Sequence, residues 1–538
     1  MKPGEIVHSV SRGAFWLGAE KAAAIFSGAA YTVLLMRWLG PTQLGIITLA
    51  FSFTGLATMV TGNLEMYLER YGAEFEARGL VLTLRRAQLL ALGVKTTLGL
   101  LASAVLLLVT PVLARRLETP ELLVLVPILV LTVVFDGLAS TGRATLFGLQ
   151  RFRWVSVLAI LFHVTKTVMV GLLWWSRQGL VALAFGFAAL SVILGLAQTA
   201  VSLWIMRRAA DHEPPEPERA WRGLFHGMFR YCLPLLGGRI AFTSGQNLSK
   251  IIVGGLFDTR LLGYFTFAYQ TVERFSEFVN SVPSALLPSL TWLVARGERE
   301  RLRSVFDQAH RLIQTLALVV SLVLFVFAFE LTRVLGSRLF LPAIPILQVM
   351  ALVPLARTAQ QPLTMLFRSL RRPGTEMTLA AVKFAAEFGS YFLLVTTLGV
   401  IGAAWSNLAG AVVSYVAALV AAARLLPEGA AERVRTSLKA LALFLPLAGL
   451  TLLVESRLPA QALVESRLPM QALVRLLFHL ALMLPMGVGL FALGLVRRQD
   501  LDKLAEVPLQ AAWTRLVRNS VLAVLGFFAR LAEPRRAS

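Results

Sequence analysis

The chain has 538 residues, of which 57% are hydrophobic and 15% are charged. A soluble protein of this length needs far more polar surface, so the composition excludes a soluble enzyme. The formal net charge of +22 would suit nucleic-acid binding, but the basic residues gather in alternate connections between apolar segments, which indicates a membrane topology instead.

Long apolar runs follow one another along most of the chain. Because backbone polar groups find no water inside a bilayer, such runs cross it as helices of ~20 residues. The alternating pattern of a membrane β-barrel is not seen. The sequence therefore predicts an all-α polytopic membrane protein with about fourteen transmembrane helices. They are expected near residues 14–36, 44–67, 88–113, 122–147, 154–175, 180–205, 231–257, 262–292, 307–331, 340–366, 377–398, 401–423, 438–454 and 471–496.

The connections between these spans alternate in basic content. The side that carries both termini holds about three times as many Lys and Arg residues as the other side, and such residues stay in the cytoplasm. We therefore expect a multi-pass protein of the inner (cytoplasmic) membrane with both termini cytoplasmic. The excess positive charge also predicts attraction to anionic membrane lipids, with no nucleic-acid partner.

The two halves of the chain repeat at an offset of about 218 residues. Leu44–Ala50 resembles Leu262–Ala268, Pro127 and Pro345 begin matching tripeptides, and a third match at Gly179 needs an offset of 220. A repeat of six spans is parallel, and such halves commonly hold substrate between them. We predict two six-helix lobes around a central cavity plus two extra C-terminal helices. The expected parts are a lobe at 1–206, a cytoplasmic linker at 207–230, a lobe at 231–426, appended helices 13 and 14 at 427–496, and a cytoplasmic tail at 497–538.

Basic side chains lie well inside the predicted spans, where they are costly and usually face a bundle interior. Lys21 and Arg239 are separated by the repeat offset, and Lys166 and Lys383 nearly so, which predicts a cationic cavity suited to phosphate. The substrate-binding candidates are Lys21, Arg239, Arg274, Lys250, Arg357, Lys166 and Lys383. Local pairing is the alternative, because Lys383 has Glu387 one turn away and Arg274 has Glu273 and Glu277 close by. Lys95 and Arg143 lie near span ends and are expected to snorkel.

Acidic residues inside the spans are the candidates for coupling to H⁺ or Na⁺. Asp136 lies mid-span without a partner in its own predicted helix. Glu273 and Glu277 share one helical face, but balancing the charge of Arg274 is the favoured alternative for them.

Motifs of enzyme chemistry are not evident. The sequence lacks a nucleotide-binding P-loop, a nucleophile constellation, metal-ligand spacing and an external loop long enough for a catalytic domain, so no enzyme activity, metal or cofactor is predicted. Asp500 and Asp502 have the D-x-D spacing of a sugar-nucleotide site but lie in a short tail, which favours coincidence.

The tail is predicted to contain an amphipathic helix at the membrane interface. Its apolar residues at helical spacing are Trp513, Leu516, Val517, Val521, Val524, Leu525 and Phe528. A ten-residue tandem copy at 454–472 lies in an external loop, and we interpret it as a slippage duplication.

Several segments resemble the polysaccharide-flippase branch of the multidrug/oligosaccharidyl-lipid/polysaccharide exporter superfamily. They are Arg37–Gly45, Tyr71–Glu74, Phe340–Leu347 and Leu398–Ala404. The resemblance implies a two-lobed bacterial transporter that flips undecaprenyl-diphosphate-linked oligosaccharide in an O-antigen, capsule or exopolysaccharide pathway. It implies a lipid-linked oligosaccharide diphosphate as cargo, polysaccharide polymerase and assembly proteins as partners, and central positions for Lys21, Arg239 and Arg274. Many relatives carry an aromatic residue at the position of Leu44.

Four other functions stay open. A drug or cation exporter would favour an acidic, aromatic cavity, and a lipid II flippase is the second alternative. A membrane glycosyltransferase or polymerase would need a long external loop with paired carboxylates. A non-transporting scaffold for polysaccharide assembly is the fourth.

Overall fold

The computed structural model describes residues 3–210, 221–280, 283, 286–457, 469–506 and 512–532. Within these ranges the regular secondary structure is helical, which confirms the predicted all-α class. Most of the tandem copy at 454–472 and the centre of the linker at 207–230 lie outside the described residues.

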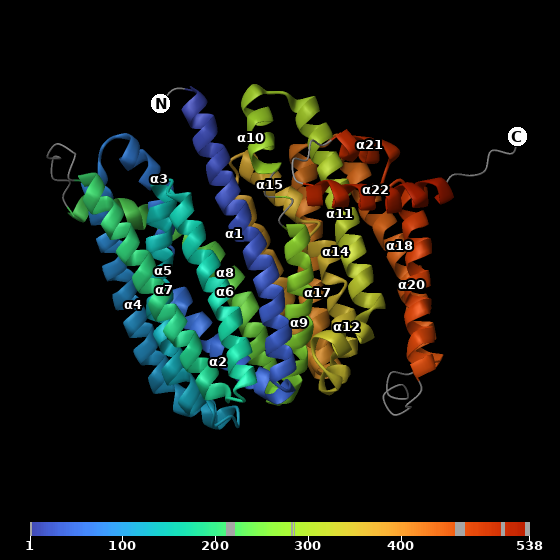
Figure 1. Ribbon diagram of the computed structural model, residues 1–538, viewed down its shortest axis with the longest axis horizontal. Helices are drawn as coiled ribbons and strands as arrows, with labels where there is room; N and C mark the ends of the chain where they lie inside the picture. The colour runs from blue at the N-terminus through green and yellow to red at the C-terminus, as the bar shows by residue number, and fades with distance from the viewer. Residues whose placement is uncertain are drawn as a thin grey trace, which may run out of the picture. The chain divides into compact units, whose positions relative to one another are not determined.

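The chain divides into two compact units, Met1–Gln270 and Thr271–Ser538. The six-helix repeat and its boundaries stay a prediction. The first unit contains α1 (Pro3–Trp38), α2 (Pro41–Val60), α3 (Glu65–Ala77), α4 (Val81–Arg116), α5 (Leu122–Gly148), α6 (Phe152–Trp175), α7 (Leu180–Ala210), α8 (Trp221–Leu256) and the start of α9 (Thr259–Asn280). The second contains the end of α9, then α10 (Leu286–Arg296), α11 (Arg299–Val326), α12 (Ala328–Leu335), the 3₁₀ helix η2 (Arg338–Ala343), α13 (Ile344–Met350), α14 (Val353–Arg357), α15 (Gln361–Ser369), α16 (Pro373–Leu398), α17 (Val400–Leu425), α18 (Ala430–Arg457), α20 (Pro469–Ala492), α21 (Arg498–Glu506) and α22 (Ala512–Ala532) (Figure 1).

Ten segments of the described chain are long and apolar enough to cross a membrane. They comprise α2, α4, α5, α6, most of α7, α11, the segment Arg338–Ser369, Gly374–Leu398, α17 and α18. The protein is therefore a multi-pass membrane protein, while the number of fourteen spans stays a prediction. The predicted spans that fall outside this set include α1, α8 and α9, which carry several of the candidate ionisable residues.

One span is broken into short helices. Arg338–Ser369 has the composition of a single span but folds as η2, α13, α14 and α15. Proline lies inside η2 and near the start of each of the other three pieces. Since proline cannot donate the backbone hydrogen bond and is well placed at a helix start, these positions favour several short helices over a continuous one.

The starts of α2 and α9 pack against each other through two glycines. A Cβ at Gly45 would overlap the carbonyl oxygen of Thr259, and a Cβ at Gly263 would overlap that of Pro41. Thr259 follows Pro41 by 218 residues, as Gly263 follows Gly45. The contact is therefore reciprocal, as expected for two equivalent helices related by a local twofold axis.

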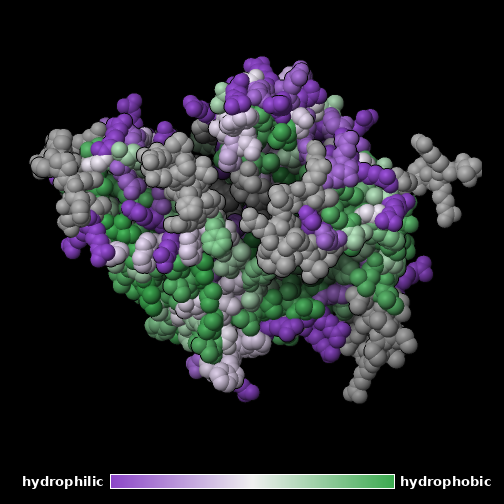
Figure 2. Space-filling view, turned by 45° about the horizontal axis from the view of Figure 1, so that its top comes forward, coloured by the Kyte–Doolittle hydropathy of each residue, from purple (hydrophilic) through white to green (hydrophobic). Residues whose placement is uncertain are grey.

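The outer surface is strongly apolar. Leu100, Leu108, Trp175 and Phe392 are between 57% and 84% exposed, and Figure 2 shows hydrophobic residues below a hydrophilic edge. Large exposed apolar surfaces mark contact with lipid or another protein, and in a multi-pass protein lipid accounts for them.

Candidate functional site

An acidic and a basic residue, adjacent on α1, face different surroundings. Lys21 is exposed, whereas Glu20 accepts hydrogen bonds from Arg143 of α5 at 2.8 Å and from Ser156 of α6 at 3.1 Å. Arg143 therefore forms an ion pair, rather than only reaching toward a membrane surface as the sequence suggested. Lys21 takes no part in that ion pair.

Two further cations of the first unit lie over tyrosine rings. The Lys166 Nζ atom is 4.4 Å from the centroid of Tyr31, and the Lys250 Nζ atom is 5.0 Å from that of Tyr269. An ammonium group over an aromatic face gains about 0.5–2 kcal/mol, most where it is desolvated. Arg239 lies within α8, but its side chain is outside the described residues.

The candidate cations of the second unit are held by carboxylates. Arg274 donates to both oxygens of Glu277, at 2.9 and 3.0 Å. Arg357 of α14 pairs with Glu273 of α9. The structure thus joins four of the predicted site residues into two ion pairs, and an anionic ligand there would have to share or displace a carboxylate.

Lys383 is also paired within its own helix. Its Nζ atom is 3.5 Å from Glu387, whose side chain is 1% exposed. Asn407 of α17 donates a 3.0 Å hydrogen bond to the same carboxylate. The i,i+4 spacing of Lys383 and Glu387 predicted this pair in advance.

Asp136 has a partner from another helix. The Ser191 hydroxyl of α7 donates to its carboxylate. Asp136 and Ser191 are 55 residues apart, so a search within one helix could not find this contact.

A buried ion pair of the first unit was missed by the sequence reasoning. Lys95 of α4 is 2% exposed and donates to Glu65 of α3 at 2.5 Å and to Ser140 of α5 at 2.8 Å. The expectation that Lys95 snorkels to the membrane surface is wrong, because an anionic partner is available inside the bundle. Glu65 lies 30 residues away, and no local spacing signals the pair.

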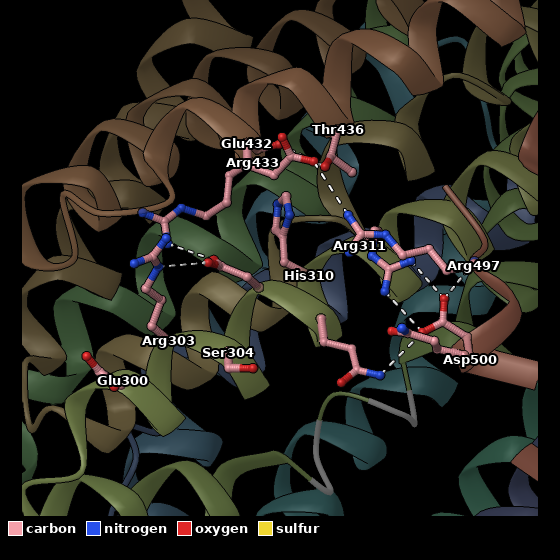
Figure 3. A pocket seen from close by; sticks show the side chains of 13 residues that line it. Glu300, Arg303, Ser304, His310, Arg311, Glu432, Arg433, Thr436, Arg497 and Asp500 are labelled. Carbon is pink, nitrogen blue, oxygen red and sulfur yellow. Dashed lines mark hydrogen bonds and ion pairs between the residues drawn. The ribbon is translucent and has the colours of Figure 1, made fainter. Parts of the chain in front are cut away.

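A polar cavity of about 510 Å³ lies in the second unit between α11, α18 and the tail (Figure 3). It is lined by four arginines and four carboxylates: Arg303, Arg311, Arg433, Arg497, Glu300, Asp307, Glu432 and Asp500. Arg433 pairs with Asp307 at 2.9 Å, and Arg303 is 3.6 Å from the same carboxylate. The four positive and four negative formal charges cancel. The cavity is therefore a network of ion pairs without a large net charge.

Asp500 connects the tail to this cluster through hydrogen bonds. Arg311 Nη1 lies 2.7 Å from Asp500 Oδ2, Arg311 Nη2 lies 3.0 Å from Oδ1, and the backbone N–H of Arg497 donates at 2.9 Å (Figure 3). Burial opposes ionisation of Asp500, but the hydrogen bonds from Arg311 and Arg497 outweigh it and lower the pKa of this carboxyl. The first aspartate of the D-x-D sequence is thus engaged in a structural ion pair.

The chain is similar to known proteins in both sequence and fold. Residues 91–345 match a family model described as "Polysaccharide biosynthesis protein". Stage V sporulation protein B of Bacillus subtilis is 24% identical over 421 residues, covering 73% of this chain and 80% of that protein. A multidrug resistance MATE family transporter of the MOP superfamily, in an inward-facing conformation, has a TM-score of 0.65 at 14% identity, covering 76% of this chain and 96% of that one. The lipid II flippase MurJ has a TM-score of 0.59 at 12% identity, covering 88% and 97%.

The family model covers residues 91–345, just under half of the chain, and this part is similar to polysaccharide biosynthesis proteins. The two solved structures, at such low identity, show the fold of this chain and neither its role nor its cargo. Within the described residues, no group of His, Cys, Asp or Glu side chains could hold a metal ion.

Proposed function

We propose that this chain is a flippase that moves an undecaprenyl-diphosphate-linked oligosaccharide from the cytoplasmic to the outer leaflet of the inner membrane by alternating access. The match of residues 91–345 to the polysaccharide biosynthesis model carries the proposal. It rests also on the ammonium groups of Lys21, Lys166 and Lys250, which can bind phosphate oxygens as point charges. Both termini face the cytoplasm in this proposal, and the polysaccharide polymerase and assembly proteins act on the flipped product.

Three lysine substitutions test the cationic site. In a strain that lacks the chromosomal gene, Lys21→Ala, Lys166→Ala and Lys250→Ala should each lower surface polysaccharide at least tenfold. Lipid-linked oligosaccharide should accumulate in the inner leaflet. Arg435→Ala is the matched control, because Arg435 lies at the start of α18 with a 72% exposed side chain and should leave export unchanged. Normal polysaccharide in all three variants at wild-type expression would overturn the cationic site.

The same strain separates the rival cargoes. Loss of peptidoglycan precursor flipping, with polysaccharide intact, would assign lipid II. Resistance to cationic dyes on overexpression, again with polysaccharide intact, would assign a drug exporter. Either result would replace the proposed cargo.

We further propose that Asp136 couples transport to H⁺ or Na⁺. A carboxylate inside a span is costly, and its contact with Ser191 holds it between α5 and α7. Asp136→Asn should abolish the dependence of flipping on a pH or Na⁺ gradient in proteoliposomes. Ser191→Ala should keep that dependence, because it leaves the carboxylate in place. An Asp136→Asn protein that still responds to both gradients would exclude this residue.

A further inference from the structure

The C-terminal helix α22 has an exposed apolar stripe on a protein that is already embedded in a membrane. Val524, Phe527 and Leu531 are 55%, 53% and 51% exposed. Their i, i+3, i+7 spacing puts them on one face. Ala529, 6% exposed, belongs to the opposite side, and the Phe528 ring packs on Gly487 of α20 so closely that a Cβ there would overlap it. One side of α22 therefore packs against α20, and the side with Val524, Phe527 and Leu531 is exposed.

The depth of this contact places α22 at the boundary between lipid and water. Gly487 is five residues before the end of α20 at Ala492, about 7.5 Å below that end at the α-helical rise. Figure 1 shows α22 running across the ends of α18 and α20 rather than along them. A helix in that position lies in the plane of the headgroups.

The apolar stripe of α22 has a counterpart in an exposed apolar face of α20. Leu477, Leu480 and Leu484 of α20 are 56%, 50% and 48% exposed and follow the same i, i+3, i+7 spacing. Both helices belong to the second unit and contact each other. Their exposed apolar residues therefore both require an apolar environment.

The polar edge of α22 is basic. Residues 512–532 contain three arginines and no Asp or Glu. Arg530 is exposed beside the apolar stripe, and Asn519, three turns earlier, is exposed on the same edge. Each basic residue near an anionic leaflet adds about 1 kcal/mol of attraction, so this edge favours anionic over zwitterionic headgroups.

The tail is also held in place from within the protein. Asp500 of α21 is bound to Arg311 of α11, and α21 contacts α22. The orientation of α22 is therefore fixed before lipid binds, which lowers the ordering cost of binding.

We propose that α22 is a membrane-surface anchor that inserts Val524, Phe527 and Leu531 into one leaflet and binds anionic phospholipid headgroups along its Arg530 edge. The occupant is lipid of the leaflet in which α20 ends. This anchor is independent of which cargo the protein carries.

Site-directed spin labels on the full-length protein test the insertion. Cys232, the single native cysteine, is first replaced in a Cys232→Ala background, and labels are attached through Phe527→Cys or Arg530→Cys. In vesicles of phosphatidylglycerol and phosphatidylcholine, the label at 527 should collide mainly with oxygen, which is enriched in hydrocarbon. The label at 530 should collide mainly with an aqueous nickel chelate.

The lipid preference is tested with the same label at position 527. Two changes should lower the ratio of inserted to water-exposed label: replacing the vesicles by pure phosphatidylcholine, and introducing Arg530→Gln. The expected decrease is about fivefold for each arginine that no longer binds an anionic headgroup. Arg435→Gln, an exposed arginine elsewhere, should not change it. Equal insertion in both lipids would overturn the headgroup site. A label at 527 that is open to the aqueous quencher, or shielded from both quenchers by a second copy of the chain, would overturn the anchor.

Discussion

Gly45 and Gly263 meet across the starts of α2 and α9, each against the other helix's backbone. The two glycines occupy equivalent places in the sequence repeat, 218 residues apart. The repeat therefore has a physical counterpart in the first unit, where two helices approach as closely as their main chains allow.

Alanine at either glycine should force these helices apart. Gly45→Ala and Gly263→Ala should each destabilise the protein by about 1–3 kcal/mol or more, measured as a lower Tm in detergent. Because both changes open the same contact, the double variant should be less destabilised than the sum of the singles. The control is Gly389→Ala, where an added Cβ meets nothing within 4 Å and helix propensity should raise stability slightly. A Gly45→Ala protein as stable as that control would contradict the close packing.

Removing the carboxylate of Asp500 should loosen the tail. Asp500→Asn leaves Arg311 buried without its anion, which costs about 3 kcal/mol and should lower Tm by several degrees. Limited proteolysis should also cleave the tail that follows Val496 faster in this variant than in the wild type. Asp502→Asn is the matched control, because Asp502 is exposed and should behave like wild type. Equal effects of the two substitutions would refute a structural role specific to Asp500.

The lowered pKa of Asp500 predicts a dependence of stability on pH. A carboxyl whose pKa is lower in the folded than in the unfolded state stabilises the fold above the unfolded value of about 3.9. That contribution disappears as pH falls through the folded value. The Tm difference between wild type and Asp500→Asn should therefore be constant from pH 7 to 5 and shrink below about pH 4. If the Tm difference between the two proteins grew as the pH fell, it would contradict the lowered pKa of Asp500.

The Lys95–Glu65 pair should be more important to folding than to transport. Lys95→Met leaves Glu65 as a poorly compensated charge and should cost about 3–5 kcal/mol. Lys95→Met combined with Glu65→Gln removes both charges and should recover most of the loss in Tm. Lys21→Met, at an exposed position, should keep Tm but lower export. If the double variant is no more stable than Lys95→Met, the pair is not the source of the loss.

Exchanging the charges of Glu273 and Arg357 separates packing from cargo binding. Arg357→Glu alone places two carboxylates together and should reduce the amount of folded protein. Adding Glu273→Arg restores an ion pair and should restore folding. If Arg357 also contacts a phosphate, export should stay at least tenfold low in the folded double variant. Full export there would limit Arg357 to a structural role.

The sequence predicts the features of this protein that depend on composition and local spacing. Apolar runs indicate the all-α membrane class, and i,i+3 or i,i+4 spacing indicates the pairs Arg274–Glu277 and Lys383–Glu387. The span expected at 340–366 is apolar enough to cross a membrane, but the structure divides it into short helices, and that division was not predicted from the sequence.

Contacts between distant helices could not be predicted in this way. Glu273 and Arg357 are 84 residues apart, and Arg311 and Asp500 are 189 apart. Which carboxylate meets which cation is decided by helix packing, and for that reason Lys95 was expected at the membrane surface and Asp500 was expected to be without a role. The repeat identified Gly45 and Gly263 as equivalent but gave no reason for them to touch.

The ion pairs of the second unit have a consequence for selectivity in the proposed flippase. A cation that already holds a tethered carboxylate can be taken only by an anion that competes with it, and the tether gives the carboxylate a high effective concentration. If Arg274 or Arg357 binds the cargo, chloride and other small monovalent anions should lose that competition, whereas a diphosphate carries enough charge to displace a carboxylate. Such a site has no net charge when empty. It would bind the abundant monovalent anions of the cell weakly and the multivalent headgroup of its cargo more tightly.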